Sequence, residues 1–195
     1  MLIAHSNPVM LAGLLYLGSG AGLLVVMTGR LLLQRTEAQS AYLTQPDVPW
    51  FGGAVFFGGV LGPSLLMYGL IHTPGSTAAL LLNLEGVFTA LLAWFVFREH
   101  FDRRILLGMV CIVLGSLLLS WDQAPASGGL LGISAIAMAC LCWAIDNNLT
   151  RKVSASDPFQ IACIKGLVAG TVNIGLAFVV GARFPEVGTY LPALA

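Results

Sequence analysis

Residues 105–119 read ILLGMVCIVLGSLLL, a run that is apolar on every side of any regular structure it could form. A strand of a membrane barrel would alternate polar and apolar side chains over about ten residues. Because backbone groups in lipid must be satisfied internally, the run predicts a continuous membrane-spanning helix. With five similar stretches it gives six predicted spans of about 20 residues each: about 8–29, 50–70, 75–97, 104–121, 129–149 and 158–182.

The composition of the whole chain also predicts a membrane protein. The 195 residues are 57% hydrophobic and 9% charged, whereas soluble domains are roughly a quarter charged. One soluble core of this length could not bury so much apolar surface. Nine Lys and Arg residues balance nine Asp and Glu residues, so no basic field exists that would bind nucleic acid. We expect an all-α, polytopic membrane helix bundle whose first partner is the lipid bilayer.

Positive charges gather on alternate connections between the predicted spans. They follow the first, third and fifth spans: Arg30, Arg35, Arg98, Arg103, Arg104, Arg151 and Lys152. The connections at 72–74 and 122–128 carry no Lys or Arg. Since positively charged loops stay in the cytoplasm, we expect a multi-pass protein of the cytoplasmic (inner) membrane with its N-terminus outside. That arrangement would be natural if one more span preceded residue 1.

A weak internal repeat relates the first predicted span to the sixth. Copies that begin on opposite sides of the membrane each need an odd number of spans, and five per copy fits. We therefore expect a first repeat at 1–127 that lacks its first helix, and an incomplete second repeat at 128–195. Inverted repeats of this kind are typical of secondary transporters. An offset of 150 residues pairs Pro8 with Pro158, Ala12 with Ala162, Leu17 with Leu167 and Gly20 with Gly170.

Two stretches combine small residues and glycines with apolar runs. The first covers 68–93 and continues through 97–99 to a glycine-bearing segment at 108–115; the second, 142–152, reads CWAIDNNLTRK. Together they resemble the EamA-like group of the drug/metabolite transporter (DMT) superfamily. The resemblance implies ten helices in two repeats, of which this chain would correspond to helices two to seven. It also implies transport of small metabolites or drugs.

Polar residues within the predicted spans are candidate binding residues, because a charge at the bilayer centre costs roughly 2.5–3.5 kcal/mol. Glu85 lies near the middle of the third span, where helical spacing places Thr89 and Ala93 on roughly its face. Asn83 lies on another face of that span. Glu85 is either a carboxylate that exchanges a proton for substrate, or a neutral or paired side chain that bonds a neighbouring helix.

A second group of polar residues lies in the fifth and sixth spans. Asp146 and Lys165 sit at similar depth near the cytoplasmic ends, so they could form an ion pair; alternatively, Lys165 binds an anionic or zwitterionic substrate. Asn147, Asn148 and Asn173 could line the same cytoplasmic vestibule.

Glycines and one proline predict where the helices pack closely or bend. Pairs four residues apart are typical of close helix packing, and they occur at Gly18/Gly22, Gly58/Gly62 and Gly166/Gly170. The dipeptide Gly62-Pro63 interrupts the second span, because proline removes an intrahelical hydrogen bond. We expect either a kink there or a broken helix whose backbone groups hold a solute.

No signature of an enzyme or of an ATP-driven pump occurs in the sequence. It has no P-loop, no G-x-S-x-G and no H-E-x-x-H. The four cysteines lie inside apolar runs without metal-ligand spacing, and we expect them to be small buried hydrophobes. The sequence therefore predicts a secondary transporter, not an enzyme, with no cofactor or metal and with Glu85 as the candidate proton carrier. The alternative is a truncated chain that does not transport and acts, if at all, in a homodimer or with a complementary half-transporter.

Overall fold

Helices dominate the chain wherever its structure is described. A computed structural model describes residues 7–32, 43–99, 102–120, 129–153 and 157–182, and no strand occurs within these ranges. The chain divides into two units, residues 1–40 with 157–195 and residues 41–156. The first unit holds α1 (Pro8–Leu32) and α8 (Pro158–Val179). Arg35 and the predicted repeat boundary at 127/128 lie outside the described residues.

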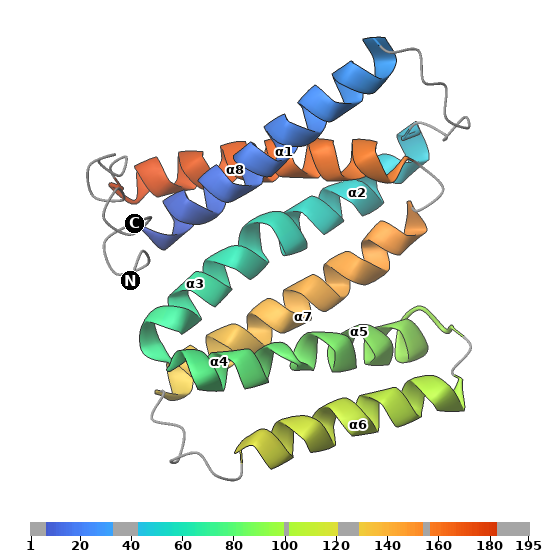
Figure 1. Ribbon diagram of the computed structural model, residues 1–195, viewed down its shortest axis with the longest axis vertical. Coiled ribbons are helices and arrows are strands. Elements are labelled where there is room, and N and C mark those ends of the chain that lie inside the picture. Colours follow the sequence, from blue (N-terminus) through green and yellow to red (C-terminus); the bar gives the residue numbers. More distant parts are fainter. Residues whose placement is uncertain (1–6, 33–42, 100–101, 121–128, 154–156, 183–195) are drawn as a thin grey trace. The chain divides into compact units, whose positions relative to one another are not determined.

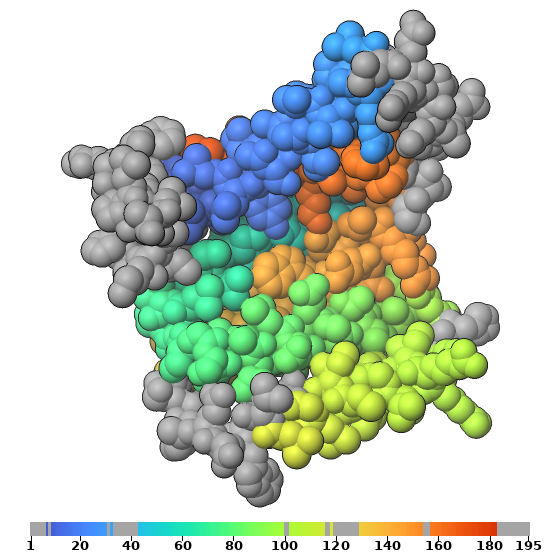
Figure 2. All heavy atoms as spheres, viewed as in Figure 1, coloured from blue at the N-terminus to red at the C-terminus, as the bar shows by residue number. Residues whose placement is uncertain are grey.

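In the second unit, α7 lies between two other layers of helix. It packs against α2, η3 and α3 on one side and against α4 and α5 on the other (Figure 1). Helix α6 runs along α4 and α5, as the space-filling view shows (Figure 2). The elements are η2 (Gln45–Asp47), α2 (Val48–Ala54), the π-helical η3 (Val55–Leu61), α3 (Gly62–His72), α4 (Gly75–Leu82), α5 (Leu84–Phe95), α6 (Arg103–Ser120) and α7 (Leu130–Lys152).

Five of the six predicted spans are confirmed as helices long and apolar enough to cross a membrane. The fourth predicted span is helical as α6, which is not one of the five; several side chains near its end lie outside the described residues. Large apolar side chains such as Leu15, Leu107 and Val179 are exposed, as suits a surface in contact with lipid. The chain is an all-α, multi-pass membrane helix bundle. The five helices are Val9–Arg30, Gln45–His72, Gly75–Phe95, Leu130–Lys152 and Pro158–Val179.

The two helices of the first unit begin with the same chemistry. Asn7 Oδ1 accepts a hydrogen bond from the Val9 amide at 3.0 Å, and Asp157 Oδ1 accepts one from the Phe159 amide at 2.9 Å. In each case the capping side chain satisfies a backbone N–H that has no partner within the helix. The proline that follows each cap has no such N–H to satisfy. Both starts therefore agree with the ends predicted for the first and sixth spans.

The contacts between α1 and α8 are symmetric. A Cβ added to Gly20 would lie 2.6 Å from the Leu167 backbone nitrogen, and one added to Gly170 would lie 2.6 Å from the Leu17 backbone nitrogen. The offset of 150 residues relates Gly20 to Gly170 and Leu17 to Leu167, so the two contacts are equivalent. Because residue numbers rise along α1 as they fall along α8, the two helices are antiparallel. The pair therefore has the geometry of two equivalent helices related by a twofold axis.

The predicted close-packing glycines are confirmed on α8 but wrong on α1. A Cβ added to Gly166 would lie 2.8 Å from the Gly20 Cα. Gly18 and Gly22 would meet no described atom within 4 Å, because they lie on a different face of α1 from the glycines that touch α8. The close contacts on α1 come instead from Gly13 and Gly20, two helical turns apart.

Glycines also line the face of the second span that packs on α7. An added Cβ on Gly58 would collide with Asp146, and one on Gly62 would lie 2.9 Å from Trp143 Nε1, which confirms this predicted close-packing pair. The step from Gly53 to Gly58 is five residues, and it enters the π-helical stretch η3. Residues five apart share a face in a π-helix, so the glycines stay on the α7 side.

The predicted interruption at Gly62-Pro63 takes the form of a change from π-helix to α-helix. The backbone stays helical, with φ −56° and ψ −57° at Gly62. Pro63 has no N–H to donate to the Gly58 carbonyl five residues earlier. The Trp143 indole Nε1–H donates to that oxygen at 3.1 Å. A side chain of α7 thus bonds the backbone group at which the sequence analysis considered a bound solute.

Replacing Trp143 with phenylalanine is expected to lower the free energy of unfolding by about 0.5–1.5 kcal/mol, because the Gly58 carbonyl loses the indole as a hydrogen-bond donor. Thermal unfolding in detergent measures the change. Trp50→Phe is the matched control, since Trp50 is 44% exposed. Equal shifts in the two variants would contradict a stabilising role for the indole hydrogen bond.

The third span contains an interruption that the sequence analysis did not predict. Helix α4 ends at Leu82 and α5 begins at Leu84. Between them, the Asn83 amide donates to the Leu80 carbonyl at 3.2 Å, a bond to the third residue back rather than the fourth. The buried Cys140 of α7 donates from Sγ to the Leu81 carbonyl at 3.5 Å. The interruption therefore packs on α7 and leaves Glu85 in the first turn of α5.

Candidate functional site

A cavity of about 360 Å³ lies between α5, α7 and the start of α6. This volume is near the lower end of the roughly 300–1,000 Å³ usual for small-molecule pockets. All of its lining residues belong to the second unit. They are Glu85, Gly86, Thr89, Ala90, Ala93, Trp94, Glu99, Ile105, Asn147, Asn148 and Arg151.

The α5 wall of the cavity is one helical stripe. Glu85, Thr89 and Ala93 recur at intervals of four residues and line the cavity together, as their predicted common face requires. Gly86 and Ala90 beside them are small, so they leave room near the carboxylate. The wall is thus mainly apolar, with Glu85 as its ionisable group.

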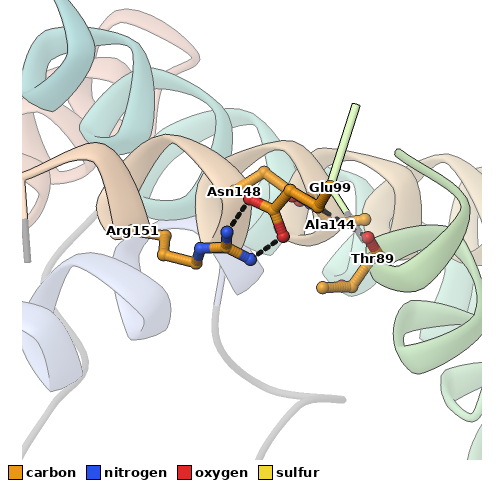
Figure 3. A network of polar contacts seen from close by, with 5 residues as sticks. All are labelled: Thr89, Glu99, Ala144, Asn148 and Arg151. Carbon is orange, nitrogen blue, oxygen red and sulfur yellow. Dashed lines mark hydrogen bonds and ion pairs between the residues drawn. The ribbon is translucent and has the colours of Figure 1, made fainter. Parts of the chain in front are cut away.

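The α7 wall supplies amide groups. Asn147 Nδ2 donates to Glu85 Oε1 at 3.0 Å and lies 3.3 Å from Thr89 Oγ1. Asn148 Nδ2 donates to the Thr89 carbonyl at 3.1 Å and to the Ala144 carbonyl at 2.9 Å (Figure 3). The buried Asn148 therefore fixes α5 against α7, whereas Asn147 bonds the carboxylate itself.

An ion pair forms part of the cavity lining. The guanidinium of Arg151, in the last turn of α7, faces the Glu99 carboxylate, with two nitrogens directed at two oxygens (Figure 3). Arg98 adopts a left-handed conformation with φ 52° just before Glu99, where the chain leaves α5. Lys152 lies over the Phe97 ring at 5.5 Å. The carboxyl-terminal ends of α5 and α7 are therefore joined by two contacts.

The cavity carries one negative charge when its ionisable groups are charged. The lining includes two carboxylates, Glu85 and Glu99, and one guanidinium, Arg151. Arg151 pairs with Glu99. Glu85 accepts its hydrogen bond from the neutral amide of Asn147. Within the described residues, no cation lies within ion-pair distance of Glu85.

The structure brings three of the predicted site residues together and separates two others from them. Glu85, Asn147 and Asn148 line the cavity. Asn83 is exposed at the interruption and does not line it. Asp146 is 5% exposed, on the side of α7 that faces Gly58, and its Oδ1 accepts a hydrogen bond from Thr150 at 3.0 Å.

Lys165 and Asn173 belong to the first unit. Lys165 on α8 is half-buried, and Asn173, two turns later, is fully buried. The predicted pairing of Lys165 with Asp146 and the shared vestibule stay predictions, since the two units are described separately.

Sequence reasoning missed the ion pair that lines the cavity. Arg151 was interpreted only as one of the basic residues that orient the chain, and Glu99 was not singled out as a candidate site residue, yet both line the cavity. A signal for Arg151 was present: it follows Asn147 by four residues on one helix, so the two share a face. Glu99 had no such signal, because its position depends on how the chain leaves α5.

Three of the four cysteines are buried within the helices. Cys140, Cys142 and Cys163 are buried as expected, but Cys111 is exposed. That expectation was wrong for Cys111 because α6 presents an apolar surface that other described helices do not cover. Among the described residues, no group of three or more His, Cys, Asp or Glu side chains could hold a metal ion.

Comparison with known proteins gives a family and two relatives. The EamA-like transporter family matches residues 1–121. An uncharacterized transporter of Methanothermobacter thermautotrophicus is 29% identical over 127 residues, 63% of this chain and 37% of that protein. The probable 4-amino-4-deoxy-L-arabinose-phosphoundecaprenol flippase subunit ArnE of Pseudomonas fluorescens is 44% identical over 62 residues, 31% of this chain and 54% of that protein. The matches thus span about a third to a half of these relatives, and no solved structure matches the chain.

Proposed function

Because the chain belongs to the EamA-like transporter family, we propose that it is a secondary transporter, or part of one, for small metabolites or drugs. It acts in the cytoplasmic membrane. The observation that carries the proposal is the cavity between α5 and α7, which has the size of a small-molecule site and an ionisable group at membrane depth. Residues of that kind inside a membrane commonly mark a solute or ion pathway.

Glu85 is the proposed coupling group. Its carboxylate lies in the middle of the third span, bonded to Asn147 and open to the cavity. A proton and a solute that compete for one carboxylate are exchanged for each other, which couples solute movement to the proton gradient. Support for this role comes from the neutral character of Asn147, whose amide donates to Glu85.

The two-repeat organisation is part of the same proposal. Residues 1–127 would form the first repeat without its first helix, and 128–195 the start of the second. The reciprocal contacts of Gly20 and Gly170 support it, because helices at equivalent positions of two inverted repeats meet in this way.

The cytoplasmic orientation is supported by where the basic residues lie. Arg151 and Lys152 end α7, Arg98 follows α5, and Arg103 begins α6. The contacts of Arg151 with Glu99 and of Lys152 with Phe97 place the ends of α5 and α7 together. Positive residues gathered at one end of the second unit favour that end facing the cytoplasm.

The proposal is tested by flux measurements on the purified chain in liposomes that contain a pH-sensitive dye. Under an imposed proton gradient, representative amines, amino acids, sugars and organic acids are added one at a time. At least one class should produce a solute-dependent change of internal pH that empty liposomes lack. If no class does so, the chain alone is not a proton-coupled carrier.

A second candidate function is favoured by one relative. The Pseudomonas relative is named as a subunit of a flippase. By analogy, this chain could act only together with a second chain, either another copy or a complementary half-transporter. Cross-linking in the native membrane followed by mass measurement tests the association. A stable complex combined with no flux from the isolated chain would support this candidate over the first.

A further inference from the structure

We propose that the cavity between α5 and α7 binds small organic monocations, with the Glu85 carboxylate as the counter-ion of an ammonium group. The inference rests on the proposed transport function and specifies its solute class. It starts from the charge balance of the cavity, whose two carboxylates face one guanidinium.

The Arg151–Glu99 pair is internally neutral, so the remaining charge belongs to Glu85. Arg151 directs two nitrogens at the two oxygens of Glu99, and an incoming anion would have to displace that carboxylate. Glu85 is bonded by an amide, and an amide does not neutralise a carboxylate. A monocation brings the cavity to electrical neutrality, whereas a zwitterion or a neutral solute leaves its charge unchanged.

The walls around Glu85 suit a cation that has an apolar body. Gly86, Ala90 and Ala93 leave space along α5. Trp94 lines the same wall about 13 Å further along the helix, where it extends the apolar surface available to the body of the solute. At about 360 Å³, the cavity accommodates a small solute and not a large one.

Benzylamine and benzyl alcohol form a suitable probe pair, because they have nearly the same shape and differ in charge at neutral pH. Calorimetric titration of the purified full chain in detergent should show binding of benzylamine. Glu85→Gln keeps an oxygen that can accept from Asn147 and removes the charge. We expect this substitution to lower the affinity for benzylamine at least about tenfold and to leave the affinity for benzyl alcohol unchanged.

The Arg151–Glu99 ion pair provides a second test, in which the direction of the change in benzylamine affinity depends on which charge is removed. Glu99→Gln leaves Arg151 unpaired, so the affinity for benzylamine should fall. Arg151→Gln leaves Glu99 unpaired, so the affinity should rise. Both variants break the same ion pair, and a merely structural role would shift binding in one direction only. Glu85→Asp, which keeps the charge, should retain most of the binding.

The outcomes separate the inference from the proposed function. Equal binding of benzylamine and benzyl alcohol, or the same direction of change in Glu99→Gln and Arg151→Gln, would overturn the monocation site. Flux of sugars or amino acids without binding of amines would also overturn the monocation site, but it would leave the proposed transport function intact. Binding of amines without flux of any solute class would support the site and contradict transport by the chain alone.

Discussion

Replacing Glu85 with glutamine is expected to reduce gradient-driven solute flux in proteoliposomes to the background of empty liposomes. The carboxylate is the ionisable group on the α5 wall, and its donor is the neutral Asn147 amide. Glutamine preserves the shape and an acceptor oxygen but cannot carry a proton between the two sides. The measurement is the change of internal pH after addition of a transported solute.

A matched control variant distinguishes a loss of proton transport from a loss of folding. Ser76→Ala changes an exposed polar residue of the same span that does not line the cavity, and it should retain flux. Insertion into the membrane and abundance should be the same for both variants. Normal flux in Glu85→Gln would show that Glu85 is not the proton carrier.

Gly20→Ala is expected to lower the free energy of unfolding by about 1–3 kcal/mol, the usual cost of overpacking. The new Cβ would lie 2.6 Å from the Leu167 backbone nitrogen, and backbone cannot move aside as a flexible side chain can. Gly170→Ala meets the equivalent Leu17 nitrogen at the same distance, so it should cost a similar amount. Thermal unfolding in detergent measures both.

Gly18→Ala is the control on the same helix. A Cβ there meets no described atom within 4 Å, and alanine favours a helix over glycine by up to about 1 kcal/mol. Its unfolding temperature should stay the same or rise. An equal loss at Gly18 and Gly20 would show that the α1–α8 contact does not limit stability.

Hydropathy and spacing predicted much of this fold, because lipid imposes strong constraints on a chain. The helices at 8–29, 129–149 and 158–182 appear with ends close to those predicted. The stripe of Glu85, Thr89 and Ala93 was also readable, since residues four apart share a helix face. These features depend on local periodicity, which the sequence displays directly.

Features that depend on neighbouring helices were not predictable in the same way. The sequence marked Gly18 and Gly22 as contact residues, but only the packing of α8 reveals that Gly13 and Gly20 are used. The π-helical stretch before Pro63 and the interruption at Asn83 depend on partners supplied by α7, Trp143 and Cys140. No local pattern near Pro63 or Asn83 identifies those partners.

The interruption at Asn83 divides the third span into α4 and α5, although the backbone angles there (φ −64°, ψ −19°) stay helical. Helix α5 has 12 residues, which corresponds to about 18 Å of length. A swing of about 10° at the interruption would therefore carry its far end about 3 Å sideways. That excursion is comparable to a hydrogen-bond length, so a small pivot could part Glu99 from Arg151 while α4 keeps its place.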